Sequence, residues 1–127
     1  MVYSSLDIQG ESSMQILIIT DTGEIIRPRA LATKLRDKGY TSTYCNWSTK
    51  AKLLLKKWDC IVIMVDSYKR TETLCTELRK ETSIHCLTPI VCRGFNAIAQ
   101  KNLSVAFTDA SIATTLDSVL TTKHKTN

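Results

Sequence analysis

Short strand-like runs alternate with amphipathic segments along most of the chain. The strand-like runs are residues 15–20 (QILIIT), 41–46 (TSTYCN), 59–66 (DCIVIMVD), 88–93 (TPIVCR) and 103–108 (LSVAFT). Their length and β-rich composition predict five strands, of which 41–46 is the weakest. The central runs are continuously apolar, which is typical of strands covered on both faces.

The intervening segments have the spacing of helices. They are residues 26–40, 48–58, 71–81, 95–102 and 111–123. Pro28 suits a first helical turn, Gly39 a helix end and Ser111 an N-cap. Leu74 and Leu78 are four residues apart and share a helical face. The pattern therefore predicts five strand–helix pairs.

Strict alternation of strands and helices favours parallel strands joined by right-handed crossovers. We expect an α/β fold with three layers: an open parallel five-stranded sheet with helices on both faces. A length of 127 residues allows one such domain. We place a polar N-terminal tail at 1–14, the domain at 15–123 and a C-terminal tail at 124–127.

Composition narrows the class of protein further. The chain is 43% hydrophobic and 23% charged, which is typical of a globular domain, and its net charge of +5 favours solubility over a specific anionic partner. The five cysteines are odd in number and form no C-x-x-C pair, which indicates a reducing, cytoplasmic compartment. No stretch approaches the length of a membrane span, so we expect no membrane partner.

Polar residues follow the predicted strands, where an open α/β sheet binds its ligands. The strands end at Thr20–Asp21, Asp66–Ser67, Arg93–Gly94 and Thr108–Asp109. Asp21, Asp66 and Asp109 would thus form an acidic rim. If the first and third strands are neighbours, Asp21 and Asp66 could hold a Mg²⁺ ion. The alternative is that these residues simply open polar loops.

The segments QILIITDTGEI, LRDKGY, WDCIVIMVD and TPIV resemble the receiver domain of two-component response regulators. The resemblance covers residues 15 to about 123. It implies the flavodoxin-like strand order 2-1-3-4-5. It also implies an acidic pair that binds Mg²⁺, a phosphoacceptor aspartate ending the third strand, and a hydroxyl and a lysine after the fourth and fifth strands.

The third strand departs from this pattern. Counting from Asp59, the phosphoacceptor position falls on Met64, and the nearest candidate phosphoacceptor, Asp66, follows two residues later. A shift of two residues keeps Asp66 on the same face of the strand. A longer strand would be needed to present it.

The remaining switch positions depart as well. The acidic pair is reduced to Thr20–Asp21, with Glu24 as a further acid. The hydroxyl position falls at Arg93–Gly94, and the lysine position at Thr108 or Asp109. The resemblance therefore implies a degenerate pseudo-receiver, because the cation that would couple an acyl phosphate to the fold is missing.

Such a domain is expected to be a regulatory module rather than an enzyme, to need no cofactor and to act through protein–protein contacts. The family's usual surface corresponds to residues 95–123, with Phe95 and Phe107 as contacts or, more often, core residues. Self-association as a homodimer is a further expectation.

Two alternatives remain open for the rim. One is an active receiver that is phosphorylated on Asp66 with Mg²⁺. The other is a flavodoxin-like domain that binds FMN or another nucleotide, with residues 20–24 (TDTGE) around the phosphate and Tyr68 against the ring.

A lysine-rich segment near two tryptophans raises a nucleic-acid alternative. Its members are Lys50, Lys52, Lys56 and Lys57, with Trp47 and Trp58 at the ends. A solvated helix face explains this pattern more simply, so nucleic acid is not the expected partner for this domain alone.

Overall fold

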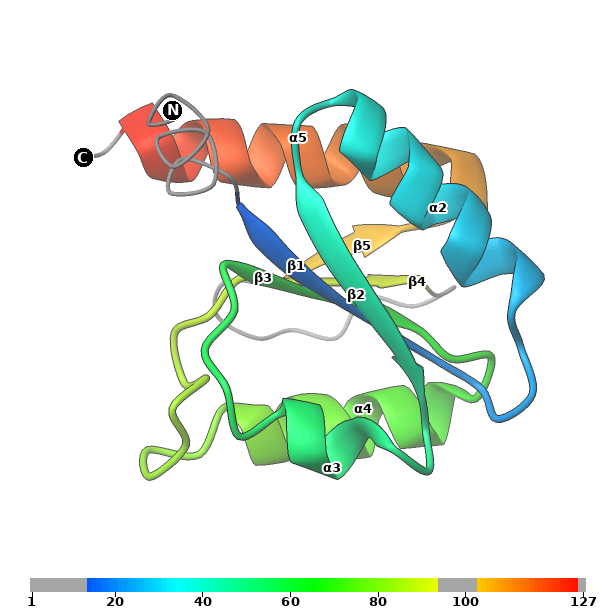
Figure 1. The fold of residues 1–127 in the computed structure, drawn as a ribbon. Coiled ribbons are helices and arrows are strands. Elements are labelled where there is room, and N and C mark those ends of the chain that lie inside the picture. Colours follow the sequence, from blue (N-terminus) through cyan, green and yellow to red (C-terminus); the bar gives the residue numbers. More distant parts are fainter. Residues whose placement is uncertain (1–13, 94–102, 126–127) are drawn as a thin grey trace, which may run out of the picture.

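The computed structural model describes residues 14–93 and 103–125. Its five strands are β1 (Gln15–Thr20), β2 (Thr41–Asn46), β3 (Cys60–Met64), β4 (Ile90–Arg93) and β5 (Leu103–Ala106). They form one parallel sheet in the order β2-β1-β3-β4-β5 (Figure 1). This is the flavodoxin-like order, so the predicted fold class is confirmed.

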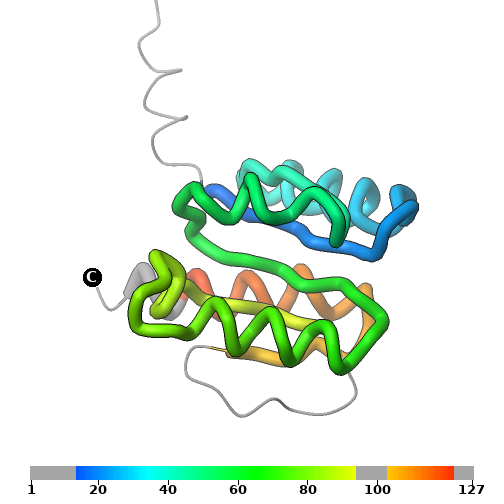
Figure 2. The backbone as a smooth tube through the Cα atoms, turned by 90° about the horizontal axis from the view of Figure 1, so that it is seen from below, coloured from blue at the N-terminus to red at the C-terminus, as the bar shows by residue number. Residues whose placement is uncertain are grey.

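Within the described residues, four helices cover the sheet: α2 (Ile26–Asp37), α3 (Lys50–Leu53), α4 (Tyr68–Leu78) and α5 (Asp109–Lys125). Helices α2 and α5 lie on one face, and α3 and α4 lie on the other (Figure 1). Figure 2 shows α3 and α4 side by side, with α3 nearer the β2 side of the sheet. No helix in the described part of the chain is long and apolar enough to cross a membrane.

The core consists of two apolar layers, one on each face of the sheet. Alternate strand residues enter each layer because successive side chains point to opposite faces. The layer under α2 and α5 contains Ile16, Ile18, Val62, Met64, Leu35, Ile112 and Leu116. The layer under α4 contains Leu17, Ile19, Ile61, Ile63, Leu74 and Leu78. Burying each large aliphatic side chain stabilises the folded state by roughly 1.5–3 kcal/mol. The central strands are continuously apolar because both of their faces are buried in this way.

Helix α3 is much shorter than the predicted helix at 48–58. The chain turns after Leu53, where the N–H groups of Leu55 and Lys56 donate to carbonyls three residues back. The indole Nε1 of Trp58 donates to Leu53 O at 2.8 Å. These tertiary and turn contacts satisfy the carbonyls that a longer helix would have used.

Other boundaries also differ from the sequence pattern. Helix α4 begins three residues early, because Ser67 Oγ accepts from the Arg70 N–H at 3.2 Å and caps the helix. Helix α5 extends two residues into the predicted C-terminal tail. Strands β3 and β5 end two residues before their predicted ends. The predicted helix at 95–102 lies outside the described residues.

Candidate functional site

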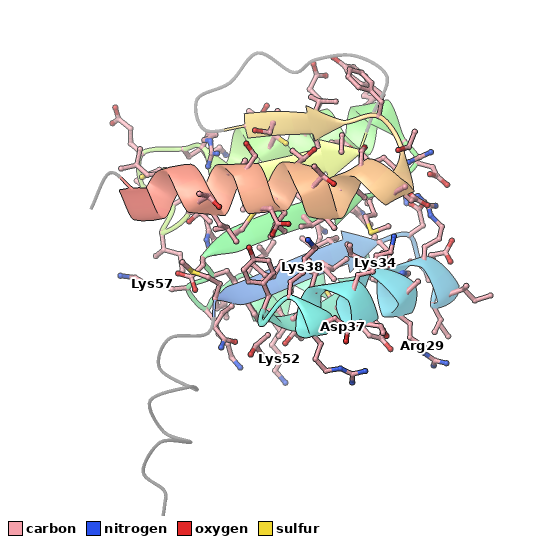
Figure 3. The ribbon with its side chains drawn as sticks, turned by 90° about the horizontal axis from the view of Figure 1, so that it is seen from above. Arg29, Lys34, Asp37, Lys38, Lys52 and Lys57 are labelled. Carbon is pink, nitrogen blue, oxygen red and sulfur yellow. The ribbon has the colours of Figure 1, made fainter. Side chains whose placement is uncertain are left out.

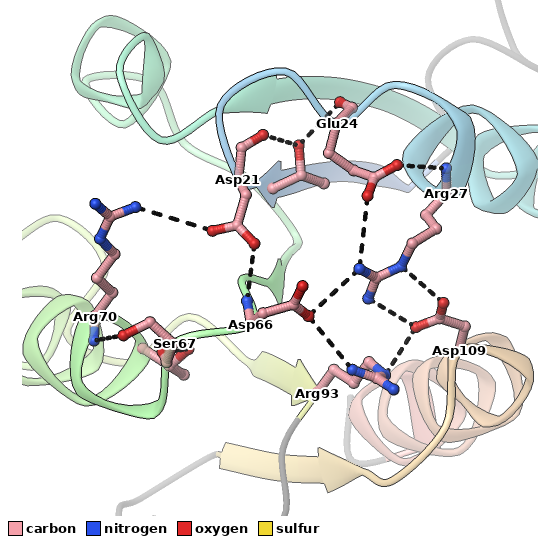
Figure 4. Close-up of polar contacts among 10 residues, drawn as sticks. Asp21, Glu24, Arg27, Asp66, Ser67, Arg70, Arg93 and Asp109 are labelled. Carbon is pink, nitrogen blue, oxygen red and sulfur yellow. Dashed lines mark hydrogen bonds and ion pairs between the residues drawn. The ribbon is translucent and has the colours of Figure 1, made fainter.

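Three of the predicted rim residues lie together at the carboxyl edge of the sheet (Figure 4). Asp21 follows β1, Asp66 lies two residues after β3, and Asp109 is the first residue of α5. Arg93, the last residue of β4, faces Asp66 and Asp109. The strand order brings these residues together, since β1, β3 and β4 are neighbours.

Asp109 is held by two arginines. Arg27 of α2 donates from Nε to Asp109 Oδ2 at 2.8 Å and from a terminal nitrogen to Oδ1 at 3.1 Å. The buried Nε of Arg93 lies 2.8 Å from Asp109 Oδ1, as an ion pair without hydrogen-bond alignment. Hydrogen bonding to Asp109 raises the pKa of Arg27 despite its partial burial. One carboxylate thus joins α2, β4 and α5.

Asp66 makes longer contacts with the same two arginines. Its Oδ1 lies 3.4 Å from Arg27 and 3.6 Å from Arg93, and 63% of its side chain is exposed. Because its carboxylate reaches Arg27 of α2, Asp66 points to the α2 side of the sheet. Asp66 is therefore the exposed member of a cluster whose inner anion is Asp109.

The remaining acids of the rim also contact cations or N–H groups. Asp21 Oδ2 accepts from the Asp66 N–H at 3.0 Å, and its Oδ1 lies 3.9 Å from Arg70. Glu24 accepts from the Arg27 N–H at 3.3 Å and lies 3.7 Å from its guanidinium. The four carboxylates and three guanidiniums nearly neutralise one another.

This arrangement fits guanidinium groups better than a divalent cation. Asp66 faces two arginines, and Asp21 is shared between a backbone N–H and Arg70. Within residues 14–93 and 103–125, no group of three or more His, Cys, Asp or Glu side chains could hold a metal ion. The Asp21–Asp66 pair therefore does not fit a Mg²⁺ ion.

Met64 occupies the position where the receiver pattern has its phosphoacceptor. It pairs in register with Thr20 of β1, and its side chain is 1% exposed within the core layer under α2 and α5. A buried thioether has no nucleophilic oxygen to accept a phosphoryl group. Met64 is a core residue.

Thr108, at the receiver's lysine position, helps to start α5. Its Oγ1 accepts from the Ser111 N–H, and Ser111 Oγ accepts from the Thr108 N–H, both at 3.2 Å. Ser111 therefore lies in the first turn and completes a reciprocal cap, rather than being the N-cap predicted from the sequence. Gly94, the other switch position, lies outside the described residues.

Phe107 was expected to be a core residue more often than a contact, and that expectation is wrong. Phe107 is 62% exposed and lies two residues before α5 begins. Phe95 lies outside the described residues.

The loop after β1 gives little support to the flavin alternative. Thr20 is 1% exposed, and its hydroxyl donates to Cys45 O at 3.4 Å. Gly23 has φ +89°, which the tight turn requires, but Asp21 and Glu24 place negative charge on either side of it. A phosphate at this turn would compete with these carboxylates for the Arg27 and Arg70 guanidiniums.

The sequence did not identify Arg27 and Arg70 as members of the rim. Both lie in the first turn of a helix that follows a strand, α2 after β1 and α4 after β3. Because such turns start at the carboxyl edge of a parallel sheet, their position was a usable signal. Which carboxylate each arginine contacts depends on how its helix is oriented, and the sequence does not show that orientation.

No family model, curated protein or solved structure matches the chain. The fold and the rim together define a flavodoxin-like α/β domain with an arginine–carboxylate cluster at its carboxyl edge.

Proposed function

We propose that the protein is a non-enzymatic signal-transduction module that resembles a receiver domain, is not phosphorylated, and acts through protein–protein contacts. The observation that supports this proposal is the pair of arginines on Asp109 and Asp66. Arg93 takes the hydroxyl position of the receiver pattern, and its guanidinium and that of Arg27 lie against Asp109, which takes the lysine position.

In this proposal, the ion pairs of the cluster hold α5 in one position at all times, as phosphorylation does in an active receiver. In an active receiver, a new anion recruits a cation and moves the attached elements. Here Arg27 and Arg93 already hold Asp109 at 2.8 Å, so α2, β4 and α5 are joined without a ligand. The proposed module has one arrangement of α5 rather than a switch between two.

The surface proposed for contact includes α5 and the residues just before it. Phe107 is an exposed aromatic side chain at the start of this surface. Exposed aromatic residues are common anchors of protein interfaces, because they bury a large area with few rotatable bonds. A cytoplasmic location and self-association through this surface form part of the proposal.

A titration with Mg²⁺ and BeF₃⁻, followed by amide NMR, tests the loss of phosphorylation chemistry. We expect no saturable shifts at Asp66, Thr108 or the start of α5, because Met64 replaces the acceptor and arginines face Asp66. An active receiver domain in the same buffer is the positive control. A saturable response that needs both reagents and disappears in Asp66→Asn would overturn the proposal and establish an active receiver.

A further inference from the structure

A strongly basic segment lies on one side of the molecule. Residues 26–59 contain nine Lys and Arg against two Asp, a net charge of +7. The whole chain carries +5, so the remaining residues carry −2. The segment spans α2, β2, α3 and the turn that follows α3. The positive charge of the protein is therefore concentrated around one strand, β2.

Most of these cations make no ion pair with the described part of the chain. Lys38 lies 2.6 Å from Asp117, Lys50 lies 3.9 Å from the centre of the Trp47 ring, and Arg27 belongs to the rim. The others are exposed and have no ion pair within the described residues: Arg29, Lys34, Arg36, Lys52, Lys56 and Lys57.

The backbone of β2 is also open along one side. β2 is the first strand in the sheet order and pairs only with β1 among the described strands. The Thr41 N–H donates to Met14 O, on the β1 side. Alternate residues of a parallel strand direct their N–H and C=O groups to the same neighbour. Ser42 and Tyr44 therefore direct theirs outward, where the described residues provide no partner.

Cations flank this open edge on both faces of the sheet. Helix α2 buries Leu31 and Leu35, and Arg29 and Arg36 are seven residues apart on a face directed away from the core. Lys52 belongs to α3, on the opposite face of the sheet. Figure 3 shows Arg29 and Lys52 extending on the side of the molecule away from α5. An added strand would have positive charge above and below it.

We propose that the outer edge of β2 binds an extended acidic segment of a partner protein as an additional strand. Main-chain hydrogen bonds to Ser42 and Tyr44 would supply the pairing, and Arg29, Arg36 and Lys52 would select acidic side chains. The inference rests on the proposed function only in that both assign the protein a role in protein–protein contact. It names a second surface, separate from α5, and the class of partner for it.

Charge and geometry favour this occupant over two others. Pairing of two copies through β2 would bring two segments of +7 together, which electrostatic repulsion opposes. Nucleic acid would use the cations but not the open N–H and C=O groups. The Trp47 ring lies under Lys50 and within 5.4 Å of Arg70, so it is not a free platform for base stacking.

The test uses the full chain and a capped peptide of alternating glutamate and threonine, followed by amide NMR and hydrogen exchange. We expect saturable shifts and slower exchange at the Ser42 and Tyr44 amides. The variant Arg29→Glu/Arg36→Glu should weaken binding about tenfold, since two attractions become repulsions. The matched control Lys69→Glu/Lys80→Glu has the same change in charge at exposed residues elsewhere and should bind unchanged.

A second peptide separates strand addition from simple charge attraction. It has the same sequence but carries N-methyl groups on the residues that would pair with β2, so its charge is kept and its pairing is lost. We expect at least about a tenfold loss of affinity, because the main-chain hydrogen bonds cannot form.

Several results would overturn the inference. These are absence of peptide binding, equal binding of the N-methyl peptide, or protection of the Ser42 and Tyr44 amides in the free chain. Tighter binding of an oligothymidylate, without shifts at these two amides, would assign the basic surface to nucleic acid instead. These outcomes concern peptide binding and the amides of β2. The test of the proposed function concerns the response to Mg²⁺ and BeF₃⁻ at Asp66, so failure of one proposal can be told from failure of the other.

Discussion

Asp109 carries the largest share of the ion pairing at the rim, although Asp66 is the acid that follows the strongest apolar run. Its two oxygens contact Arg27 and Arg93 at 2.8–3.1 Å, whereas the Asp66 contacts are 3.4 Å and longer. Charge-assisted pairs weaken with distance and exposure, so Asp109 has the stronger effect on stability. Of the two acids, the one expected to contribute more to stability, Asp109, is therefore distinct from Asp66, the candidate phosphoacceptor.

Replacing Asp109 tests this assignment. We expect Asp109→Asn to lower the free energy of unfolding by about 1 kcal/mol, a value kept small because 42% of the side chain is exposed. Urea unfolding measures the change, and added salt should reduce it by screening. The control is Glu72→Gln on α4, an exposed acid with no ion pair in the described part of the chain. Equal losses in both variants would contradict the role of the cluster.

At the scale of elements, α2 is joined to α5 at both of its ends, and the second junction falls in the middle of α5. The rim joins their N-termini, and Asp117 of α5 accepts from Lys38 Nζ at 2.6 Å and Tyr40 Oη at 2.7 Å just after α2. Burial and the hydrogen bond to Asp117 raise the pKa of Tyr40 to about 12. Burial alone would raise the pKa of Asp117, but the bonds from Lys38 and Tyr40 outweigh it and lower the pKa.

This second junction predicts a pH dependence of stability. Because the pKa of Asp117 is lower in the folded state, its stabilisation is present above the ordinary value of 3.8 and is lost as the pH falls through the folded-state value. Asp117→Asn should cost about 1 kcal/mol at neutral pH and flatten the acid side of the stability profile. Asp37→Asn on α2, exposed and without a described partner, is the control. Parallel acid profiles for wild type and Asp117→Asn would refute this junction.

At the scale of the whole molecule, the burial of the cysteine side chains indicates how completely the helices cover the sheet. Cys45, Cys60, Cys75 and Cys92 are buried, and Cys86 alone of the five is partly exposed. Burial raises the pKa of Cys75 to about 12 and that of Cys45 and Cys92 to about 11. Thiolates, which are the reactive form, are therefore scarce in the core.

We accordingly expect one of the five thiols to react quickly with a thiol reagent in the native protein. All five should react in denaturant. The variant Cys86→Ser should remove the fast phase and leave the slow phase unchanged. Fast reaction of two or more thiols in the native protein would show that the core opens more readily than its burial indicates.

The sequence by itself determined the number and type of the described strands and the α/β class, because continuous apolar runs separated by amphipathic segments allow few other arrangements. The order of the strands in the sheet was implied by the resemblance to receiver domains. The sequence also placed Asp21, Asp66, Arg93 and Asp109 at one edge, since strand ends meet there. Only the tertiary structure decided which cations meet these acids, that α3 ends at Leu53, and that Phe107 is exposed. Those outcomes depend on how helices pack and turn relative to the sheet, and local residue patterns do not encode such long-range geometry.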